Sequence, residues 1–556
     1  MQQTPEWLLE RVVLVGIRAA NPDHGYRMFE TMNDRGARLT AVDRLKSHLL
    51  SHVGAGEDQL NTQWHEMLRE LAIDREDPTA ASRFIKAFLL ARCARENCDD
   101  DRRQIETNLN VWVRRNAARL GLVAERPQHF MQFVQDLLKS ARLFRPFLAA
   151  CRALKRDRDR LEAMLFNERN GLSCQAVAVL AAIDPDDQPS AAKDKGRLVA
   201  AYIDRWYALR ALQDLPVQSA DVENLVHATL VPLLRGCCTV ADVASALGDL
   251  AVRDGGSTRD AVTLGLRGNN AHQIRYLLAR ATAYVEEACQ RPHDVLAYLD
   301  RDRFHIEHLW ANHHHRVIRE IPDVVVFRSR RNQLGGLGLL MGRENSSLND
   351  LPLTDKAASY ARSNVLLGII APGYDRRNPL LRDFTKTHKF DKVLRSFGPR
   401  ETMTSVVQTR QELYLRLFEH IWNPERLGLA VTSPSQHSGP DELTATARPV
   451  ATRRRPAPGR RRTDVARMIE AHILTPGTRI VLTYCSTDHW ATIEEDGGIV
   501  LTATGGTPYG RVDEAGAVAR GTKTCQGMNE WHIENEDGVR TSLRTLRDTA
   551  VASGAL

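Results

Sequence analysis

The chain has 556 residues, of which 43% are apolar and 26% are charged, and its formal net charge is +7. A chain of this length predicts three or four domains with separate hydrophobic cores. No apolar run reaches the roughly 18 to 20 residues of a membrane span, and the N-terminus lacks the layout of a secretory signal, so we expect a cytoplasmic protein with no membrane partner. The nine cysteines form no C-x-x-C pair and indicate neither a thiolate zinc cage nor a disulfide framework.

The N-terminal segment, residues 1–55, predicts one strand followed by two helices. The apolar run at 12–17 is typical of a strand, and residues 23–34 are interpreted as a helix that ends at Gly36. Gly36 suits a helix C-cap, and Thr40 is placed to cap the N-terminus of the second helix.

Residues 56–298 predict a long helical region, because apolar residues recur there at three- and four-residue spacing. The segment FMQFVQDLLKSARLF at 130–144 is an example. Between 299 and 430 the pattern changes, and short apolar segments alternate with Gly, Asn and Pro, which favours mixed α and β structure. A helix resumes over 403–422.

Residues 431–463 are rich in Pro, Ser, Thr and Arg and predict a flexible linker. Six of the ten residues at 453–462 are arginines, among them Arg453, Arg454 and Arg455. Such a run attracts polyanions such as DNA, and a solvated linker without a partner is the alternative. Residues 464–550 combine one segment of helical spacing with short β-type runs, which predicts a small separate α+β domain.

The segment DRFHIEHLWANHHH at 302–315 places five histidines around Glu307. Glu307 and His308 form an acid–histidine pair, and Asn345 and then Lys356 follow downstream. Carboxylate and amide oxygens are ligands that a hard divalent cation prefers, and a histidine off the metal can take a proton from an attacking water, so the pattern suits a metal-assisted phosphodiesterase site. Because neighbouring residues of a strand point to opposite faces, one shared site requires an irregular backbone at the pair.

Two other interpretations of these histidines stay open. They can form a solvated surface cluster, or His305 and His308 can be part of a zinc site. His313, His314 and His315 are expected at the surface.

The segment FHIEHLW, followed by RRNQLGGLGLLMGRENSSLNDLPLTDKAASYARSN, resembles the HNH module at the C-terminal end of GmrSD-type restriction endonucleases, over roughly 300–375. The resemblance implies Glu307 and Asn345 as ligands of a divalent ion, Mg²⁺ or alternatively Mn²⁺, with His308 as general base. We expect Lys356 to lie near the phosphate. Gly336 stands where the family has an asparagine, which is expected to loosen the loop that orients the histidine, and the proline expected after the E-H pair is absent.

The segment YRMFETMNDRGARLTAVDRLKSHLL at 26–50 resembles an element of the ParB-like module of the same family. The residues that match in order are Phe29, Glu30, Asn33, Gly36 and Leu39. The upstream D-G-Q-Q-R motif, associated with nucleotide handling, is not in this chain. The resemblance therefore implies a separate polypeptide that carries the missing half, a different start of the protein, or loss of the nucleotide-dependent part, and a structural role for the matched element is expected.

Most of the segment 464–550 resembles the RAMA domain, the restriction-enzyme and adenine-methylase associated module, which implies a reader of modified DNA. The matching residues are Tyr484, Ala491, Gly497, Tyr509, Ala519, Gly527 and Trp531. The residues expected to contact DNA are Tyr484, Trp490, Tyr509 and Trp531 by stacking on a base, and Arg511 and Lys523 by meeting phosphate. The alternative for the aromatic residues is a place in the core of a small domain.

These features predict a multidomain, mainly α protein. It would have a long helical region, an α+β HNH (ββα-metal) nuclease module with its following helix within 299–430, and a small C-terminal α+β domain after a flexible linker. The expected function is a modification-dependent DNA endonuclease in restriction and anti-phage defence, targeted by its C-terminal domain. The alternative is a non-catalytic DNA-binding or regulatory subunit of a split restriction system, in which Gly336 marks a decayed site.

Overall fold

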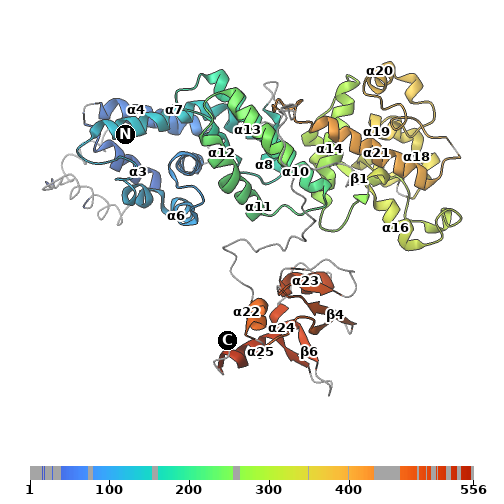
Figure 1. Ribbon diagram of the computed structural model, residues 1–556. Helices are drawn as coiled ribbons and strands as arrows, with labels where there is room; N and C mark the ends of the chain where they lie inside the picture. The colour runs from blue at the N-terminus through green and yellow to red at the C-terminus, as the bar shows by residue number, and fades with distance from the viewer. Residues whose placement is uncertain are drawn as a thin grey trace, which may run out of the picture. The chain divides into compact units, whose positions relative to one another are not determined.

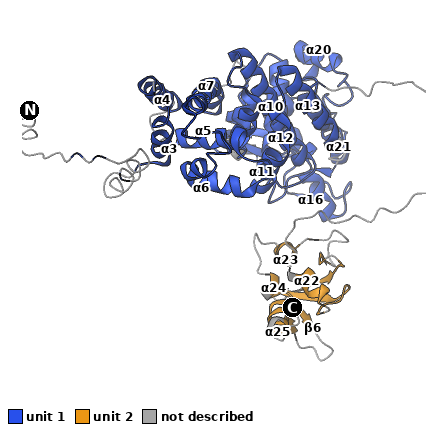
Figure 2. Cartoon of the chain, turned by 60° about the vertical axis from the view of Figure 1, so that its left-hand side comes forward, with its two compact units in different colours: residues 1–437 blue, residues 438–556 orange. Residues whose placement is uncertain are grey.

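The computed structural model divides into two compact units, Met1–His437 and Ser438–Leu556 (Figure 2). It describes residues 39–430 and 464–552, apart from gaps at 55, 73–78, 153–160, 255–262, 349, 399, 472, 485–486, 496, 502–508, 510, 521–526 and 535–539, together with positions 16, 18 and 28. The strand predicted at 12–17, the helix predicted at 23–34, the matched residues 29–36 and the linker at 431–463 fall almost entirely outside the described residues.

The N-terminal part of the first unit is helical, as its periodicity predicted (Figure 1). Its α-helices are α3 (Ala41–Leu50), α4 (Glu57–Leu71), α5 (Ala80–Phe88), α6 (Asp99–Arg115), α7 (Pro127–Arg152), α8 (Glu162–Arg169), α9 (Gln175–Ala182), α10 (Pro189–Leu212), α11 (Ser219–Asn224), α12 (Val231–Arg235), α13 (Val240–Arg253), α14 (Ala271–Ala288) and α15 (Val295–Leu299). Two π-helical segments, η1 (Leu89–Cys93) and η2 (Leu225–Leu230), continue α5 and α11.

Local sequence accounts for where some of these helices begin. The predicted cap at Thr40 is confirmed, since its hydroxyl accepts from the Asp43 amide at 3.1 Å while the Asp43 carboxylate accepts from the Thr40 amide at 3.0 Å. Thr239 and Asp242 cap α13 in the same reciprocal way. Each pair satisfies amides that the first helical turn leaves without partners.

The C-terminal part of the first unit joins two strands to short helices. In chain order these are β1 (Phe304–His308), η4 (His314–Arg316), α16 (Val324–Asn332), η5 (Leu334–Gly336), β2 (Leu337–Met341), α17 (Gly342–Leu348), α18 (Leu353–Tyr360), α19 (Val365–Gly368), η6 (Asp375–Arg377), α20 (Pro379–Thr387) and α21 (Met403–Ile421). The mixed α and β structure and the helix predicted over 403–422 are confirmed.

The largest hydrophobic core of the first unit extends from Val42 to Leu429, and two smaller clusters lie around Leu309 and Phe327. Helix α14 is central to it, because it contacts α10 of the helical region as well as β2, α19 and α21 (Figure 1). A buried polar cluster strengthens this connection: Asp204 on α10 accepts from Arg280 on α14 at 2.6 Å and from the Trp422 indole at 2.9 Å. Described residues from each of the three segments expected at 1–55, 56–298 and 299–430 therefore belong to this largest core.

The short turn before β2 is held tightly by α21. The Arg410 guanidinium is buried and donates to the carbonyls of Gly335 at 2.9 Å, Leu366 at 2.6 Å and Leu337 at 3.0 Å. The Gly335 amide donates to the Gln411 side chain at 2.8 Å. A Cβ atom at Gly336 would lie 2.7 Å from the Arg331 carbonyl oxygen, so an asparagine does not fit this backbone. The turn is therefore closely packed at Gly336 and is held by hydrogen bonds from α21.

The second unit contains a five-stranded antiparallel sheet in the order β5-β4-β3-β6-β7. The strands are β3 (Arg479–Tyr484), β4 (Thr487–Ile493), β5 (Ile499–Leu501), β6 (His532–Glu534) and β7 (Arg540–Ser542), and the helices are α22 (Asp464–Glu470), α23 (Val512–Arg520), α24 (Gly527–Glu530) and α25 (Leu543–Ala552). The sequence indicated one segment of helical spacing in this unit, whereas the structure has α23, α24 and α25 in addition to α22, with α25 directly after β7.

Among the helices that the structure describes in both units, none combines the length and the apolar character needed to cross a bilayer.

Candidate active site

The expected site residues lie on β1, α17 and α18. Strands β1 and β2 pair antiparallel, with Glu307 opposite Gly338 and His308 opposite Leu337, and α17 contacts both strands. This strand–strand–helix arrangement brings the helix that carries Asn345 next to the strand that carries the acid–histidine pair. The pairing of β1 is regular, so Glu307 and His308 point to opposite faces of the ribbon and meet different neighbours.

Glu307 is 3% exposed and is part of a buried ion pair. Its Oε1 accepts from Lys356 Nζ at 2.7 Å and from the Tyr360 hydroxyl at 2.6 Å, and both donors lie on α18. Burial, and then the charge of Glu307, raise the pKa of Tyr360, so the hydroxyl keeps its proton and remains a donor. The network attaches α18 to β1 through an interaction between groups 49 positions apart.

Lys356 is 1% exposed, and its second partner is the His308 carbonyl oxygen at 3.1 Å. In this arrangement its ammonium group does not reach a phosphate, because both of its partners lie inside the protein. The expected contact with DNA is therefore replaced by a structural role: the ammonium group neutralises Glu307 and holds the end of β1. A buried carboxylate without such a partner would be strongly unfavourable.

His308 faces α16, where Asn332 Oδ1 lies 3.0 Å from the imidazole Nε2. Burial, and then the nearby Arg331 guanidinium, lower the pKa of His308 to about 4. The imidazole is consequently neutral near pH 7. Because an amide oxygen can only accept, Nε2 must carry the proton, and the lone pair is on Nδ1. Asn332 thus selects the tautomer and the orientation of the ring.

The sequence did not single out Asn332. It lies four positions before Gly336, and it reaches His308 because α16 ends directly before the turn that leads into β2. A side-chain amide at the last residue of a helix is the only signal in the sequence, and the hydrogen bond depends on how α16 packs beside β1.

Asn345 lies in the backbone of α17, and its side chain falls outside the described residues. The other expected metal ligand, Glu307, already shares Oε1 with an ammonium group and a hydroxyl. A divalent ion at that oxygen would be repelled by Lys356, so the described donors do not fit the expected metal site as they stand. Among the described residues, no three His, Cys, Asp or Glu side chains converge in a way that could hold an ion.

The other histidines of the segment have separate neighbours. His313 Nε2 lies 3.2 Å from an Asp350 carboxylate oxygen, His314 Nε2 lies 2.7 Å from the Ile321 carbonyl oxygen, and His315 is exposed. The surface position predicted for these three is confirmed for His315, while the other two are partly buried.

The residues expected to read DNA in the second unit differ in exposure. Trp531 is fully buried in the core and its indole donates to the Val512 carbonyl at 3.0 Å, so it is not available to stack on a base. Trp490 is partly exposed, and the Arg479 guanidinium lies over its ring at 4.6 Å from the centroid. Tyr509 is partly buried and Arg511 is exposed. The expected contacts whose side chains fall outside the described residues are Tyr484, Lys523, Arg453, Arg454 and Arg455.

No protein-family model matches the chain, and a search of curated proteins finds no match.

Proposed function

We propose that this chain is a modification-dependent DNA endonuclease acting in defence against invading DNA, and that it hydrolyses the phosphodiester bond with His308 as general base. The observation that supports this most directly is the hydrogen bond between His308 and Asn332. It holds a neutral imidazole in one tautomer at the end of β1, beside the helix that carries Asn345.

In the proposed reaction, His308 Nδ1 accepts a proton from the water whose oxygen attacks phosphorus. The P–O bond to the leaving nucleoside oxygen breaks, and that oxygen takes a proton from solvent and departs as an alcohol. The resulting imidazolium carries a proton on each nitrogen, and its Nε2–H group still donates to Asn332 Oδ1. The Glu307–Lys356 ion pair fixes the backbone of β1 at His308, because Lys356 also binds the His308 carbonyl. No step is assigned to a metal ion, since the described donors do not build a site for one.

The second unit would bias cutting toward modified DNA. Trp490, with Arg479 over its ring, offers a flat face and a positive charge, and the exposed Arg511 adds a further cation. Aromatic faces stack on bases and guanidinium groups meet phosphates. The Arg-rich segment at 453–462 would raise the local concentration of DNA near the first unit.

Cleavage of modified and unmodified duplex DNA, each assayed with Mg²⁺, with Mn²⁺ and with a chelator, tests the proposal. We expect cleavage of the modified duplex. If neither duplex is cut under any of these conditions, the endonuclease assignment is wrong.

A second candidate function, a non-catalytic DNA-binding or regulatory subunit, is favoured by the buried Glu307–Lys356 pair, which occupies the expected metal ligand. Calorimetric titration with Mg²⁺ and Mn²⁺ separates the two candidates. Binding that disappears in both Glu307→Gln and Asn345→Ala would support a metal-dependent nuclease, whereas the absence of such binding together with retained DNA affinity would support the regulatory subunit.

Replacing Asn332 with alanine is expected to lower kcat for DNA cleavage about tenfold and to leave KM unchanged, because the ring of His308 loses the acceptor that orients it. Asn332→Asp keeps an acceptor oxygen and should retain more activity. Nitrogen NMR of His308 is the second readout: the Nε2–H tautomer should dominate in the parent protein and should mix with the Nδ1–H form in Asn332→Ala. Identical spectra would contradict the positioning role.

Replacing Trp490 with alanine is expected to weaken binding of modified DNA about tenfold, the effect of losing one stacked base. His489→Ala is the matched control, since neighbouring residues of β4 point to opposite faces. Fluorescence anisotropy with labelled modified DNA measures both variants. Equal affinity for Trp490→Ala and the parent protein would show that the base is read elsewhere.

A further inference from the structure

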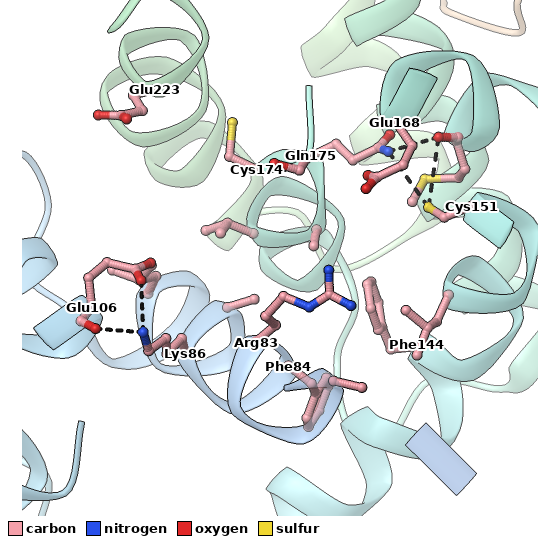
Figure 3. Close-up of a pocket in the computed structure, with 18 of the residues that line it drawn as sticks. Arg83, Phe84, Lys86, Glu106, Phe144, Cys151, Glu168, Cys174, Gln175 and Glu223 are labelled. Carbon is pink, nitrogen blue, oxygen red and sulfur yellow. Dashed lines mark hydrogen bonds and ion pairs between the residues drawn. The ribbon is translucent and has the colours of Figure 1, made fainter. Parts of the chain in front are cut away.

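A cavity of about 510 Å³ opens among the helices of the first unit (Figure 3). Residues of α5, η1, α6, α7, α8, α9, α11 and η2 line it, and none of these elements carries a residue of the candidate active site. Its volume lies within the range of small-molecule binding sites in proteins. The cavity is therefore a feature that the proposed nuclease chemistry does not use.

The floor of the cavity is formed by closely packed apolar side chains. Phe84, Phe144 and Met164 are among its lining residues and are each buried, and Leu148 extends this surface from α7. The two phenylalanine rings pack against each other, with centroids 5.9 Å apart. Such a floor suits a flat apolar group, because an aromatic ring gains both buried area and ring contacts there.

The rim of the cavity is charged and predominantly basic. Its cationic residues are Arg83, Lys86, Arg102, Arg103 and Arg152, and its carboxylates are Glu106, Glu168 and Glu223. Figure 3 shows the Arg83 side chain reaching into the space and the Lys86–Glu106 contact at its edge. Three of these cations already form ion pairs: Lys86 with Glu106, Arg102 with Asp99 and Glu223, and Arg103 with Asp100. The lining still has five cations against three carboxylates, and ion pairs this exposed are weak, so an anionic group can compete for the cations at the mouth of the cavity.

Both π-helical segments of the described chain border this region. Leu90 of η1 and His227 of η2 line the cavity, and the same two residues also line a neighbouring cavity of about 240 Å³. The wide turn of η1 is held by Arg235, whose guanidinium donates to the carbonyls of Ala91 at 2.6 Å and Leu90 at 2.9 Å. Single π-helical turns are rare and occur frequently at functional sites, so their convergence here is independent evidence for a binding site.

We propose that this cavity binds an organic phosphate with a flat apolar body, of the size of a mononucleotide. The ring would lie on the floor formed by Phe84 and Phe144, and the phosphate would meet the rim cations contributed by α5 and α6. Both parts of the ligand are needed. A free phosphate would find few polar partners on the floor, and an uncharged ring would leave the rim cations without an anion to bind. The site is separate from His308 and does not depend on the proposed nuclease activity.

Isothermal titration calorimetry of the full chain tests this with three probes: the four ribonucleoside 5′-monophosphates, the corresponding nucleosides, and inorganic phosphate. We expect saturable binding of at least one monophosphate below about 1 mM and at least about tenfold weaker binding of its nucleoside and of inorganic phosphate. No saturable binding of any monophosphate would overturn the proposal, as would equally tight binding of inorganic phosphate alone.

Two variants locate the bound ligand. Arg103→Gln should weaken binding about tenfold, while Arg115→Gln, an exposed arginine on the same helix that does not line the cavity, should leave it unchanged. Leu148→Trp should occupy the space of the ring and abolish binding, with folding verified by circular dichroism. Equal effects of Arg103→Gln and Arg115→Gln, or unaltered binding in a folded Leu148→Trp, would place the ligand elsewhere and refute this site.

Discussion

Replacing His308 with alanine is expected to abolish cleavage of modified DNA, with a loss of about 10²- to 10⁴-fold in kcat, the usual contribution of a general base. The variant should bind DNA as well as the parent protein, because the imidazole acts on the attacking water. The measurement is a single-turnover cleavage assay with excess enzyme, which separates chemistry from binding.

His315→Ala is the matched control, since His315 lies in the same histidine-rich segment but is exposed and separate from β1. Cleavage should be unchanged in this variant. If His308→Ala cuts at the parental rate, His308 is not the base, and any nuclease activity of the preparation arises elsewhere. Amide exchange of β1 and β2 in both variants establishes that a loss of rate does not come from unfolding.

The second large effect is expected on stability. Lys356→Ala should destabilise the first unit by about 3–5 kcal/mol, because it leaves the 3% exposed carboxylate of Glu307 without its cation. Hydrogen exchange of the β1 and β2 amides, measured by mass spectrometry across a urea series, reports the free energy of opening for this part of the chain. The large cost follows from the dehydration of a charge, which no side-chain rearrangement of alanine can offset.

Two comparisons make this result specific. The double variant Glu307→Gln/Lys356→Met removes both charges together and should recover most of the lost stability. Arg416→Ala removes one partner of the exposed Arg416–Glu412 pair on α21 and should cost less than about 1 kcal/mol. If Lys356→Ala costs no more than Arg416→Ala, the Glu307–Lys356 pair is not the buried, stabilising contact described here.

Lys356→Ala and the double variant also distinguish the two candidate functions, the nuclease and the regulatory subunit. A nuclease that requires the geometry of β1 should lose both stability and cleavage in Lys356→Ala. In the double variant Glu307→Gln/Lys356→Met it should regain cleavage in proportion to the recovered stability of β1. A regulatory subunit should show the loss of stability alone. The buried pair therefore connects the fold to the proposed chemistry through the backbone of His308, whose carbonyl Lys356 also binds.

Several features could be read from local sequence because their causes are local. The helical spacing of α7 and α21, the cap at Thr40 and the strand around Glu307 each depend on residues within one or two turns. The same holds for most strands of the second unit. Helix α25 was missed because it directly follows the extended residues Arg540–Ser542. The segment is so short that its apolar positions do not distinguish a helix from a strand.

The site itself depended on contacts that sequence spacing does not contain. Lys356 was expected at a phosphate and lies buried against Glu307. For Trp531 the sequence left open a base contact and a place in the core, and the structure has it in the core. Asn332, which orients His308, was not anticipated, because α16 precedes the turn and its packing beside β1 decides whether the amide reaches the ring.

The sequence by itself determined the helical character of the first unit and the position of the acid–histidine pair on a strand, since hydrophobic periodicity and capping act over a few residues. Only the tertiary structure decided what each member of that pair faces: an ammonium and a hydroxyl from α18 for Glu307, and an amide from α16 for His308. The physical reason is that burial and pairing of charges depend on elements far apart in the chain, brought together by a core shared from Val42 to Leu429.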